Sequence, residues 1–416
     1  MFGTVDELVR DGVQNRSIAA AVPVPNKLFY FCSEVSDATT LKRIQQFIDH
    51  GFDITVFGFH RTRYNTGHQP AWPYVPLGLT VDGRYWHRLR AMFGALPAII
   101  ANRRRLKGSG LFYARNLDQL ILALFARLIA FSRAPIVYEV LDIPPFLAAR
   151  GVGPMLFRWI ERLCLHGVKL LVLSSPAFHR QYYATTQKYR GPWFLLENKL
   201  HPSITAVDRP GADTAAETTT RERGSPWIVG YFGLIRGQGT FDLMTRLAER
   251  LQGRVHFKFR GALTTVDPAS FHTALARLPN IEFGGPYVPH KDLEELYSSV
   301  DFAWALDLEH TDHNSRWLMP CRFYESGYFG VPCLAVRSFE VGSVLERHHI
   351  GFTFERPLEE QLVHFFETLT VADYEHIRAR LRAVPREMFV ADDDATRLCS
   401  MMEGLKQQPE QQPQRG

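Results

Sequence analysis

Residues 314–336 read NSRWLMPCRFYESGYFGVPCLAV. Pro320 stands where a helix would begin, and Gly330 stands where it would end. Proline is favoured in the first turn of a helix, and glycine is favoured just past its last residue. The apolar residues 332–336 that follow are typical of a buried strand. The stretch therefore predicts a helix–strand unit of an α/β fold, with Glu325 inside the helix.

A second stretch, YFGLIRGQGT at residues 231–240, has the order strand, short loop, helix. Gly233 ends the strand, and Arg236 and Gly237 lie in the loop. Glycine lets a phosphate approach the backbone, the helix N-terminus offers free N–H groups, and arginine could form two hydrogen bonds to a diphosphate. The stretch predicts a phosphate site, although the same pattern also describes an ordinary tight turn.

Outward from these stretches, β-rich runs alternate with helical stretches along the chain, as in an α/β fold with parallel sheets. The strands predicted in the first half are 28–32, 53–59, 111–114, 136–140, 170–173 and 193–196. Those predicted in the second half are 227–232, 256–260, 281–283, 301–306 and 332–336. The main predicted helices are 40–50, 117–130, 154–166, 240–252, 290–298 and 323–329.

The alternation stops and restarts near the middle of the chain, which predicts two Rossmann-like domains facing across a cleft. A length of 416 residues also suits two domains. Residues 202–225 are rich in Pro, Gly, Thr and charge, like a linker or an exposed loop. The predicted division is a first domain at 1–201, this linker, a second domain at 226–385, a helix at 386–404 that is a candidate to pack back on the first domain, and a disordered tail at 405–416.

The first half is more basic than the second. Residues 1–200 contain 25 Lys+Arg against 13 Asp+Glu, whereas the whole chain contains 48 against 43. This asymmetry indicates an anionic partner, such as a phospholipid surface or nucleic acid. Because the basic half shows no aromatic-interleaved recognition motif, nucleic acid is not an expected partner.

The five cysteines are scattered and show no CxxC spacing, so neither a disulfide framework nor a zinc site is expected. The N-terminus has no apolar segment of a secretory signal, and no run of ~18 uncharged apolar residues predicts a membrane span. We therefore expect a cytoplasmic protein, with the inner face of the cytoplasmic membrane as a candidate location.

Residues 84–107 combine basic composition with a helical apolar pattern. The residues near one helical face are Leu89, Met92, Phe93, Leu96 and Ile100, with Pro97 as a predicted kink. The basic flanks are Arg84, Arg88, Arg90, Arg103, Arg104, Arg105 and Lys107. Such a stretch can lie on an anionic membrane, and the alternative is a helix that packs on the core with solvated ends.

Three stretches of the second half, VGYFGLIRG, YVPHKDLEELYSSVDFAWAL and MPCRFYESGYFGVPCLA, resemble in order and spacing the donor-binding domain of GT-B glycosyltransferases. The resemblance is strongest to family 4, whose members include enzymes of exopolysaccharide biosynthesis. It covers about residues 226–345 and continues weakly through IVYEVLDIPP and LLVLSSPAF. It implies a first domain that binds the acceptor and a second domain that binds a nucleotide sugar.

The resemblance further implies transfer of a sugar from a donor linked to uridine or guanosine diphosphate. The best candidate acceptor is a lipid-linked saccharide. No cofactor and no metal are implied, because GT-B enzymes stabilise the departing diphosphate with side chains and helix dipoles.

In this resemblance, Glu325 would bind the ribose and Arg236 would contact the diphosphate and act in catalysis. Gly233 would give the diphosphate room, and Arg322 would contact the phosphates or make a structural ion pair. Family 4 members often carry two glutamates spaced E-x7-E, but the first of these positions is Trp317 here. The sugar-recognition loop therefore differs from the family pattern, which leaves the donor sugar and the stereochemistry open.

The same resemblance assigns the backbone near Tyr287 and Val288 to the base pocket. The residues assigned to the donor-sugar loop are Asp312, His313, Asn314, Ser315 and Arg316. The acidic and histidine residues near this loop and the acidic run 392–394 show no distinctive ligand spacing, so no metal site is expected.

In the first half, Glu139 and Asp142 lie at the end of the strand IVYEV, at the expected cleft edge. Asp142 is the candidate catalytic residue that positions or deprotonates an acceptor hydroxyl, and the alternative is a turn or N-cap residue ahead of two prolines. Further candidates for acceptor contact are Glu34, Asp37 and His60.

Two other functions remain open from the sequence. A GT-B sugar-nucleotide epimerase would convert the sugar or release free nucleotide without an acceptor. A non-catalytic scaffold would bind the nucleotide sugar without hydrolysis or transfer.

Overall fold

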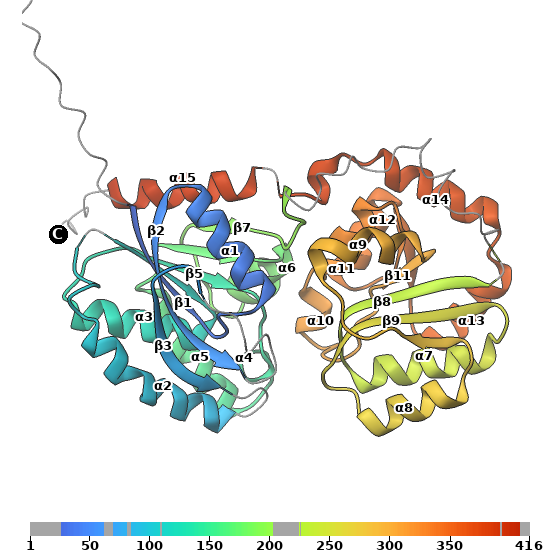
Figure 1. The fold of residues 1–416 in the computed structure, drawn as a ribbon, viewed down its shortest axis with the longest axis horizontal. Helices are drawn as coiled ribbons and strands as arrows, with labels where there is room; N and C mark the ends of the chain where they lie inside the picture. The colour runs from blue at the N-terminus through green and yellow to red at the C-terminus, as the bar shows by residue number, and fades with distance from the viewer. Residues whose placement is uncertain are drawn as a thin grey trace, which may run out of the picture.

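The computed structural model describes residues 26–61, 70–80, 85–108, 110–202, 224, 226–391 and 393–407. It consists of two α/β halves, each built around a sheet of parallel strands (Figure 1). Nearly all of the predicted linker, 202–225, lies outside the described residues, as does the tail beyond residue 407.

The sheet of the first half has the strand order β3-β2-β1-β4-β5-β6-β7, and neighbouring strands pair in parallel. Parallel neighbours require crossover connections, which explains why helices separate most strands in the sequence. The strands are β1 (Asn26–Cys32), β2 (Phe52–Arg61), β3 (Tyr74–Thr80), β4 (Leu111–Arg115), β5 (Ile136–Val140), β6 (Leu170–Leu173) and β7 (Trp193–Leu195).

Helices cover both faces of this sheet. One face packs against α2, α3 and α5, and the other packs against α1 and α15, the last helix of the chain. Leu398 and Met402 of α15 share a core cluster with Leu28 and Tyr30 of β1, so the C-terminal helix lies on the first half. The helices are α1 (Ala38–Asp49), α2 (Tyr85–Ala101), α3 (Leu117–Ile129), α4 (Pro145–Ala148), α5 (Val152–Leu165), α6 (Pro176–Phe178) and α15 (Asp394–Gln407).

The sheet of the second half has the order β10-β9-β8-β11-β12-β13. Its strands are β8 (Trp227–Ile235), β9 (Val255–Leu263), β10 (Ile281–Phe283), β11 (Phe302–Trp304), β12 (Cys333–Val336) and β13 (Gly351–Phe354). Its helices are α7 (Gln238–Arg250), α8 (Pro268–Arg277), α9 (Pro289–Ser298), α10 (Asn314–Trp317), α11 (Cys321–Tyr328), α12 (Glu340–His348), α13 (Leu358–Thr368) and α14 (Val371–Ala383). The predicted fold class, two Rossmann-like α/β domains, is confirmed.

The predicted strands are all present to within a few residues, but the edge strands β3 and β13 were not predicted. β3 contains Pro76 and Gly78, which the sequence patterns treat as strand breakers. An edge strand tolerates both residues, because one side of its backbone needs no partner strand. α15 runs through Gln407, so residues 405–407 of the predicted tail are helical.

The two halves touch through specific contacts. Leu200 forms a parallel bridge with Val390 where the chain returns to the first half. The Tyr324 hydroxyl of α11 donates to Glu197 Oε1 at 2.9 Å, and Arg180 Nη2 lies 2.6 Å from Glu340 Oε2. Among the described residues, no helix is both long and apolar enough to span a bilayer.

Candidate active site

The carboxyl ends of β8 and β9 form a strip of backbone without side chains. Gly233 has φ +109° and Gly261, its partner in the β8–β9 ladder, has φ +133°. A Cβ atom on Gly261 would lie 1.8 Å from the Gly233 carbonyl oxygen. Only glycine fits such a position, so the two strands approach here without side chains between them. Gly261 was not predicted as a site residue, although its place at the end of a predicted strand could have identified it.

Arg236 follows β8 and is held by acidic partners. Its Nε and Nη2 donate to Asp307 Oδ2 at 2.9 and 2.6 Å, and Glu309 Oε2 lies 3.6 Å from Nε. Burial alone would raise the pKa of Asp307, but the Arg236 guanidinium and the Glu309 N–H outweigh burial and hold that pKa below its usual range. Asp307 thus orients Arg236 through one edge of the guanidinium and leaves Nη1 for another anion.

Tyr231 connects Arg236 to Arg322. The Tyr231 hydroxyl donates to the Arg236 carbonyl at 3.2 Å, and the Arg322 guanidinium carbon lies 4.2 Å from the centre of the Tyr231 ring. Arg322 also donates from Nη1 to the Trp304 carbonyl at 2.7 Å and is buried. Its guanidinium is therefore fixed by a carbonyl and an aromatic face, on the same side of the sheet as Arg236.

Glu325 lies one turn after Arg322 on α11. Its Oε2 accepts a hydrogen bond of 2.8 Å from the Tyr297 hydroxyl. Burial raises the pKa of Glu325, although Tyr297 and Arg322 act against the rise. Burial also raises the pKa of Tyr287, and the Glu325 charge adds to that rise, so Tyr287 stands close to Glu325.

The same tyrosine faces the glycine strip, because a Cβ atom on Gly233 would lie 4.0 Å from the Tyr287 hydroxyl. The structure thus brings Gly233, Arg236, Tyr287, Arg322 and Glu325 to one edge of the second sheet. Val288 is exposed on the same segment, and its N–H donates to Asp292 Oδ2 at 2.8 Å.

The residues of the predicted sugar loop fall into two groups, those whose contacts hold the loop in place and those that have no such contacts. Asn314 is buried and spans the junction: its Oδ1 accepts from the Ile143 N–H, and its Nδ2 donates to Asp142 Oδ1, both at 3.1 Å. Ser315 is buried, and its Oγ accepts from the His310 N–H at 3.0 Å. These two side chains hold the loop in place.

His313 differs from its neighbours, because both of its ring nitrogens are buried and have no hydrogen-bond partner among the described residues. Burial lowers the pKa of His313, which favours the neutral imidazole. A neutral imidazole offers one donor and one acceptor, which matches a sugar hydroxyl. Asp312 and Arg316 on the same loop are exposed.

Trp317, at the position where the family pattern has glutamate, packs against the core of the first half. Its carbonyl accepts a hydrogen bond of 2.5 Å from Ser175 Oγ. The departure from the family motif thus has a structural explanation: this residue anchors the loop to the opposite half.

Asp142 contributes to the site from the first half. Asp142 contacts Asn314, and its negative charge also stabilises the protonated guanidinium of Arg236. Burial would lower the pKa of Arg236, but Asp307, Asp142 and Glu309 outweigh burial and raise it. The two candidate catalytic residues, Asp142 and Arg236, therefore lie near each other across the junction of the halves.

The other acceptor candidates have structural contacts. Glu139 is only 1% exposed and pairs with Arg43 and Arg115, so it is not accessible to an acceptor. Glu34 is buried and accepts from the Ser36 N–H at 2.9 Å. Asp37 caps the N-terminus of α1. His60 remains half-buried beside the Tyr74 ring, with 5.4 Å between the ring centres.

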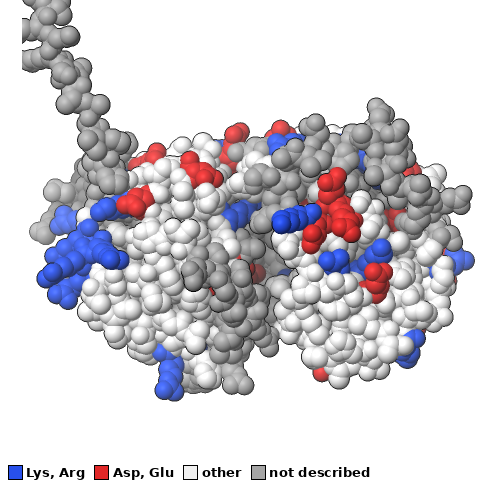
Figure 2. Space-filling view, viewed as in Figure 1, with Lys and Arg blue, Asp and Glu red and all other residues white. Residues whose placement is uncertain are grey.

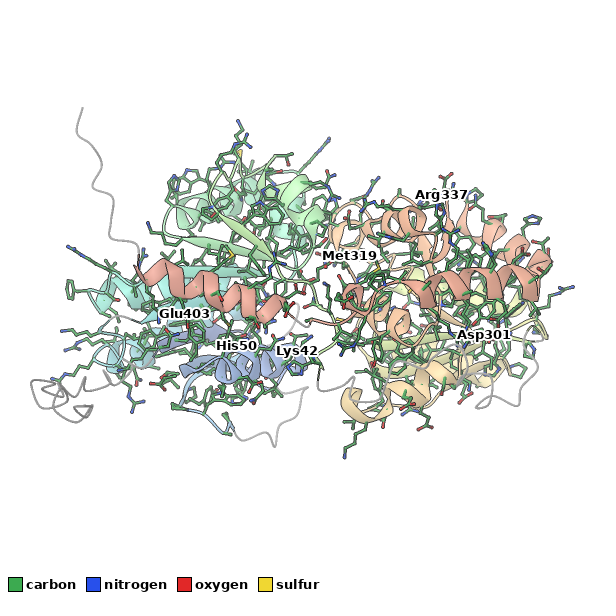
Figure 3. All side chains as sticks on the ribbon, turned by 90° about the horizontal axis from the view of Figure 1, so that it is seen from above. Lys42, His50, Asp301, Met319, Arg337 and Glu403 are labelled. Carbon is green, nitrogen blue, oxygen red and sulfur yellow. The ribbon has the colours of Figure 1, made fainter. Side chains whose placement is uncertain are left out.

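Lys42 was not predicted as a site residue. It lies on α1, on the side of the first half that faces the second (Figure 3), and its Nζ donates to the Lys199 carbonyl. Burial lowers the pKa of Lys42 to about 8, with Arg43 contributing, while Cys321 and Glu325 of α11 act in the opposite direction. Lys42 therefore brings a positive charge from the first half to the N-terminal end of α11.

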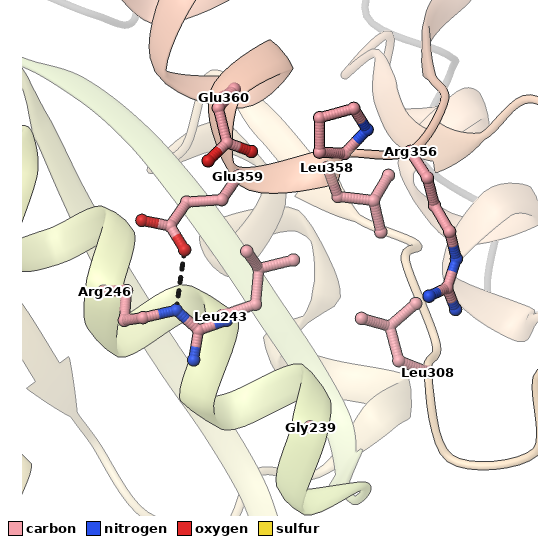
Figure 4. Close-up of a pocket in the computed structure, with 9 residues that line it drawn as sticks. Gly239, Leu243, Arg246, Leu308, Arg356, Leu358, Glu359 and Glu360 are labelled. Atoms are coloured by element: carbon pink, nitrogen blue, oxygen red, sulfur yellow. Dashed lines mark hydrogen bonds and ion pairs between the residues drawn. The ribbon is translucent and has the colours of Figure 1, made fainter.

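A separate hollow of about 510 Å³ lies between α7 and α13 (Figure 4). The Arg246–Glu359 ion pair closes one side, with 2.7 Å between Nε and Oε2. Its lining includes none of the predicted site residues. Among the described residues, no group of His, Cys, Asp and Glu is placed to hold a metal ion.

No model of a known protein family matches the chain. The chain is 28% identical over 357 residues to the succinoglycan biosynthesis protein ExoL of Rhizobium meliloti (strain 1021), a match that spans 85% of this chain and 87% of that protein. Its fold is similar to Anabaena HepE, solved in complex with UDP and glucose, with a TM-score of 0.65, 14% identity and coverage of 91% of this chain and 99% of that one. It is also similar to sucrose-phosphate synthase from Thermosynechococcus elongatus, with a TM-score of 0.66, 12% identity and the same coverage. The predicted resemblance is confirmed: the chain is a homologue of a succinoglycan biosynthesis protein, and its fold is that of GT-B glycosyltransferases.

Proposed function

We propose that this glycosyltransferase moves a sugar from a uridine diphosphate-linked donor to a lipid-linked saccharide acceptor in exopolysaccharide biosynthesis. The observation that carries the proposal is the array Arg236–Tyr231–Arg322 beside Glu325 at the carboxyl edge of the second sheet. In open α/β sheets, nucleotides bind at this edge. Structures of HepE, which has the same fold, contain UDP and UDP-glucose.

In the proposed site, the ribose hydroxyls donate to the Glu325 carboxylate, and the base stacks near Tyr287. The diphosphate rests against the glycine strip, with Arg236 Nη1 and the Lys42 ammonium as its charged partners. The N–H groups at the start of α11 add the positive end of a helix dipole. When the sugar departs, these groups stabilise the negative charge that develops on the diphosphate. The proposal requires no cofactor.

The acceptor hydroxyl would approach from the first half. Asp142 stands at the junction beside Asn314, where it can accept a hydrogen bond or a proton from that hydroxyl. His313, with unpartnered ring nitrogens, is the member of the sugar loop proposed to contact the donor sugar. The basic first half would hold the protein at the inner face of the cytoplasmic membrane, where a lipid-linked acceptor resides.

Glu325→Ala is expected to weaken UDP binding about 10- to 100-fold, because one charge-assisted hydrogen bond contributes about 1.5–3 kcal/mol. Calorimetric titration of the full chain with UDP measures this change. Glu360→Ala, at an exposed glutamate of α13, is the matched control and should leave Kd unchanged. Equal UDP affinity in wild type and Glu325→Ala would contradict the proposed site.

UDP affinity is also expected to depend on Lys42 protonation. Because the pKa of Lys42 is lowered to about 8, UDP binds best below this pH, and affinity falls as the pH rises through about 8. Lys42→Met should lose this dependence and about tenfold in affinity at neutral pH. Lys42→Arg should lose the dependence but keep the affinity, since arginine stays protonated.

The measurement is the ratio of wild-type to Lys42→Met Kd for UDP between about pH 6.5 and 9.5. Taking the ratio cancels the titration of UDP itself, which both proteins share. A ratio that does not change with pH would mean that Lys42 does not contact the diphosphate.

A further inference from the structure

Helix α5 carries an apolar stripe on its solvent side. Val152, Met155, Leu156, Trp159 and Leu163 follow the helical spacing i, i+3, i+4, i+7 and i+11. Their exposed fractions are 79%, 59%, 53%, 54% and 50% in the same order. A surface helix normally turns such a stripe toward the core.

The opposite side of α5 fixes this unusual orientation. Glu161, fully buried, accepts hydrogen bonds from the hydroxyls of Tyr138, Tyr182 and Tyr183 and from the Gln187 amide, at 2.6–3.1 Å. Rotating the helix to bury the stripe would break these bonds and leave buried polar groups unpaired, which costs about 1–3 kcal/mol for each group. The outward stripe is therefore a stable property of the fold.

Neighbouring helices extend the apolar surface. α3 lies between α2 and α5 and ends beside α5, where Arg127 Nη1 donates to the Gly167 carbonyl at 3.3 Å. Just past this contact, Leu128 and Phe131 are 72% and 90% exposed. α2 adds the exposed side chains of Leu89, Phe93 and Ile100, while its Met92 and Leu96 pack on the core. We call α2, the end of α3 and α5 the outer helical face.

With Phe157 of α5, which is 42% exposed, this face holds eleven of the eighteen large apolar side chains that are exposed among the described residues. Single exposed apolar residues are common on proteins, but a concentration on one side indicates a contact surface.

The outer helical face is also basic and exposes almost no carboxylate. Within residues 85–108 and 143–169, the acidic residue is Glu161, which is fully buried. The exposed basic residues in these ranges are Arg90, Arg103, Arg104, Arg105, Lys107, Arg150, Arg162 and Lys169. Figure 2 shows the lower left of the molecule, where α2 lies in Figure 1, as white and blue without red. Arg84, at the start of the predicted basic stretch, lies outside the described residues.

We propose that the outer helical face docks on an anionic lipid bilayer, with the α5 stripe inserted among the headgroups and the basic residues around it on the phosphates. An apolar stripe with basic flanks is the pattern of helices that lie in a membrane interface, and tryptophan favours that depth. A second copy of this chain fits less well, because two such faces would oppose basic residues to basic residues. The proposal deepens the membrane contact of the proposed function, because it adds the exposed apolar stripe of α5 to the basic residues of the stretch 84–107.

Docking on this face also brings the acceptor side of the site toward the lipid. α5 is preceded by α4 and by Asp142, whose carboxylate contacts Asn314 at the junction of the halves. Arg158 ties α5 to the end of α4 through the carbonyls of Leu147 and Ala149, at 3.0 and 2.8 Å. A lipid-linked acceptor could thus reach Asp142 from the bilayer.

The test is co-sedimentation of the full chain with vesicles, without donor or acceptor. Wild type should bind vesicles of phosphatidylcholine and phosphatidylglycerol (3:1) and bind pure phosphatidylcholine vesicles at least tenfold more weakly. The triple variant Met155→Ser/Leu156→Ser/Trp159→Ser should lose at least tenfold of the binding to anionic vesicles. The matched control Ile48→Ser/Val371→Ser/Met401→Ser changes exposed apolar residues elsewhere and should bind like wild type.

A second variant tests how much the basic residues of the outer helical face contribute to vesicle binding. Arg103→Gln/Arg104→Gln/Arg105→Gln should weaken binding to anionic vesicles on the order of a hundredfold, since each basic group near the surface contributes roughly fivefold. Lys291→Gln/Arg347→Gln/Arg380→Gln, at exposed positions of the second half, should have little effect.

Unchanged vesicle binding by the α5 triple variant would overturn the proposal. The proposal would also be overturned if the wild type bound no vesicles and formed a dimer that the same variant converted to a monomer. That result would assign the face to a second copy of the chain. UDP affinity of the α5 variant should equal that of wild type, because the stripe does not line the donor site. Loss of vesicle binding with intact UDP binding separates this inference from the proposed function, which Glu325→Ala tests by itself.

Discussion

Replacing Arg236 with alanine is expected to lower kcat about 10²- to 10³-fold, the usual loss when a donor that stabilises developing charge is removed. The effect should fall on kcat more than on KM, because the diphosphate becomes most negative as the sugar leaves. The structure supports this role through the Asp307 contact, which holds the guanidinium by Nε and Nη2 and leaves Nη1 for another anion. The measurement is steady-state release of UDP from a UDP-sugar with a membrane-lipid extract as acceptor.

Two further variants separate catalysis from structure at this position. Arg236→Lys keeps a positive charge but loses the planar fork, so it should recover only part of the rate. Asp307→Asn keeps Arg236 and removes the charge that orients it, so kcat should fall less than in Arg236→Ala. If Arg236→Ala instead raised KM for the donor and left kcat unchanged, Arg236 would bind the ground state only and would not be catalytic.

Each part of the site that could be predicted lies within a short, continuous stretch of sequence. Arg236 and Glu325 were predicted because each sits in a strand–loop–helix or helix–strand unit whose glycines and prolines mark its boundaries. The backbone geometry of such units depends on neighbouring residues, so a local pattern is enough to identify them.

The parts that could not be predicted depend on contacts between distant segments. Lys42 reaches α11 only because the two halves fold against each other. Asn314 was predicted to hold a sugar, whereas its amide is used by Asp142 and Ile143 of the other half. Trp317 could not be interpreted without the core against which it packs.

The α5 stripe shows a related limit of sequence patterns. Helical spacing in residues 152–163 indicates that apolar residues share one face, but it gives no information about which way the face points. The direction is set by Glu161, whose partners come from a strand and from residues that follow a later strand. The predicted membrane stretch 84–107 combines an apolar helical pattern with seven basic residues. Helix α5 contains two basic residues, so the combined pattern favours the stretch 84–107.

Loss of Glu139 is expected to destabilise the first half by about 3–5 kcal/mol, a large part of the stability of a typical domain. Glu139 lies under the carboxyl edge of the first sheet, where Arg43 Nη2 and Arg115 Nε lie 3.0 and 2.9 Å from its two oxygens. Glu139→Ala would leave both guanidinium groups buried without their carboxylate. Glu139→Gln should cost less, because the amide oxygen keeps one acceptor.

Lowering the pH should reduce the stability that Glu139 contributes to the fold. Burial alone would raise the pKa of this carboxyl, but Arg43 and Arg115 outweigh burial and hold the pKa below its usual range. A carboxyl with a lowered folded-state pKa stabilises the fold above its unfolded pKa, and this stability is lost as the pH falls through the folded pKa. The difference in unfolding free energy between wild type and Glu139→Gln should therefore be full at neutral pH and shrink below about pH 4.5.

Glu161 is the matched control, because it is a fully buried glutamate of the same half with no cation among its hydrogen-bond partners. Burial raises the pKa of Glu161, so its contribution to stability depends on pH in the opposite direction. The protonated carboxyl stabilises the fold at low pH, and this stability is lost as the pH rises through the folded-state pKa. Glu161→Gln replaces one acceptor oxygen by an amide N–H2 but leaves no cation without its counter-charge, so it should cost less at neutral pH than Glu139→Gln. Urea unfolding of the three proteins at about pH 7 and pH 4 measures the contrast. Equal losses for both glutamine variants at neutral pH would contradict the prediction, because the charge of Glu139 would then contribute no more to stability than the charge of Glu161, which has no cation as a partner.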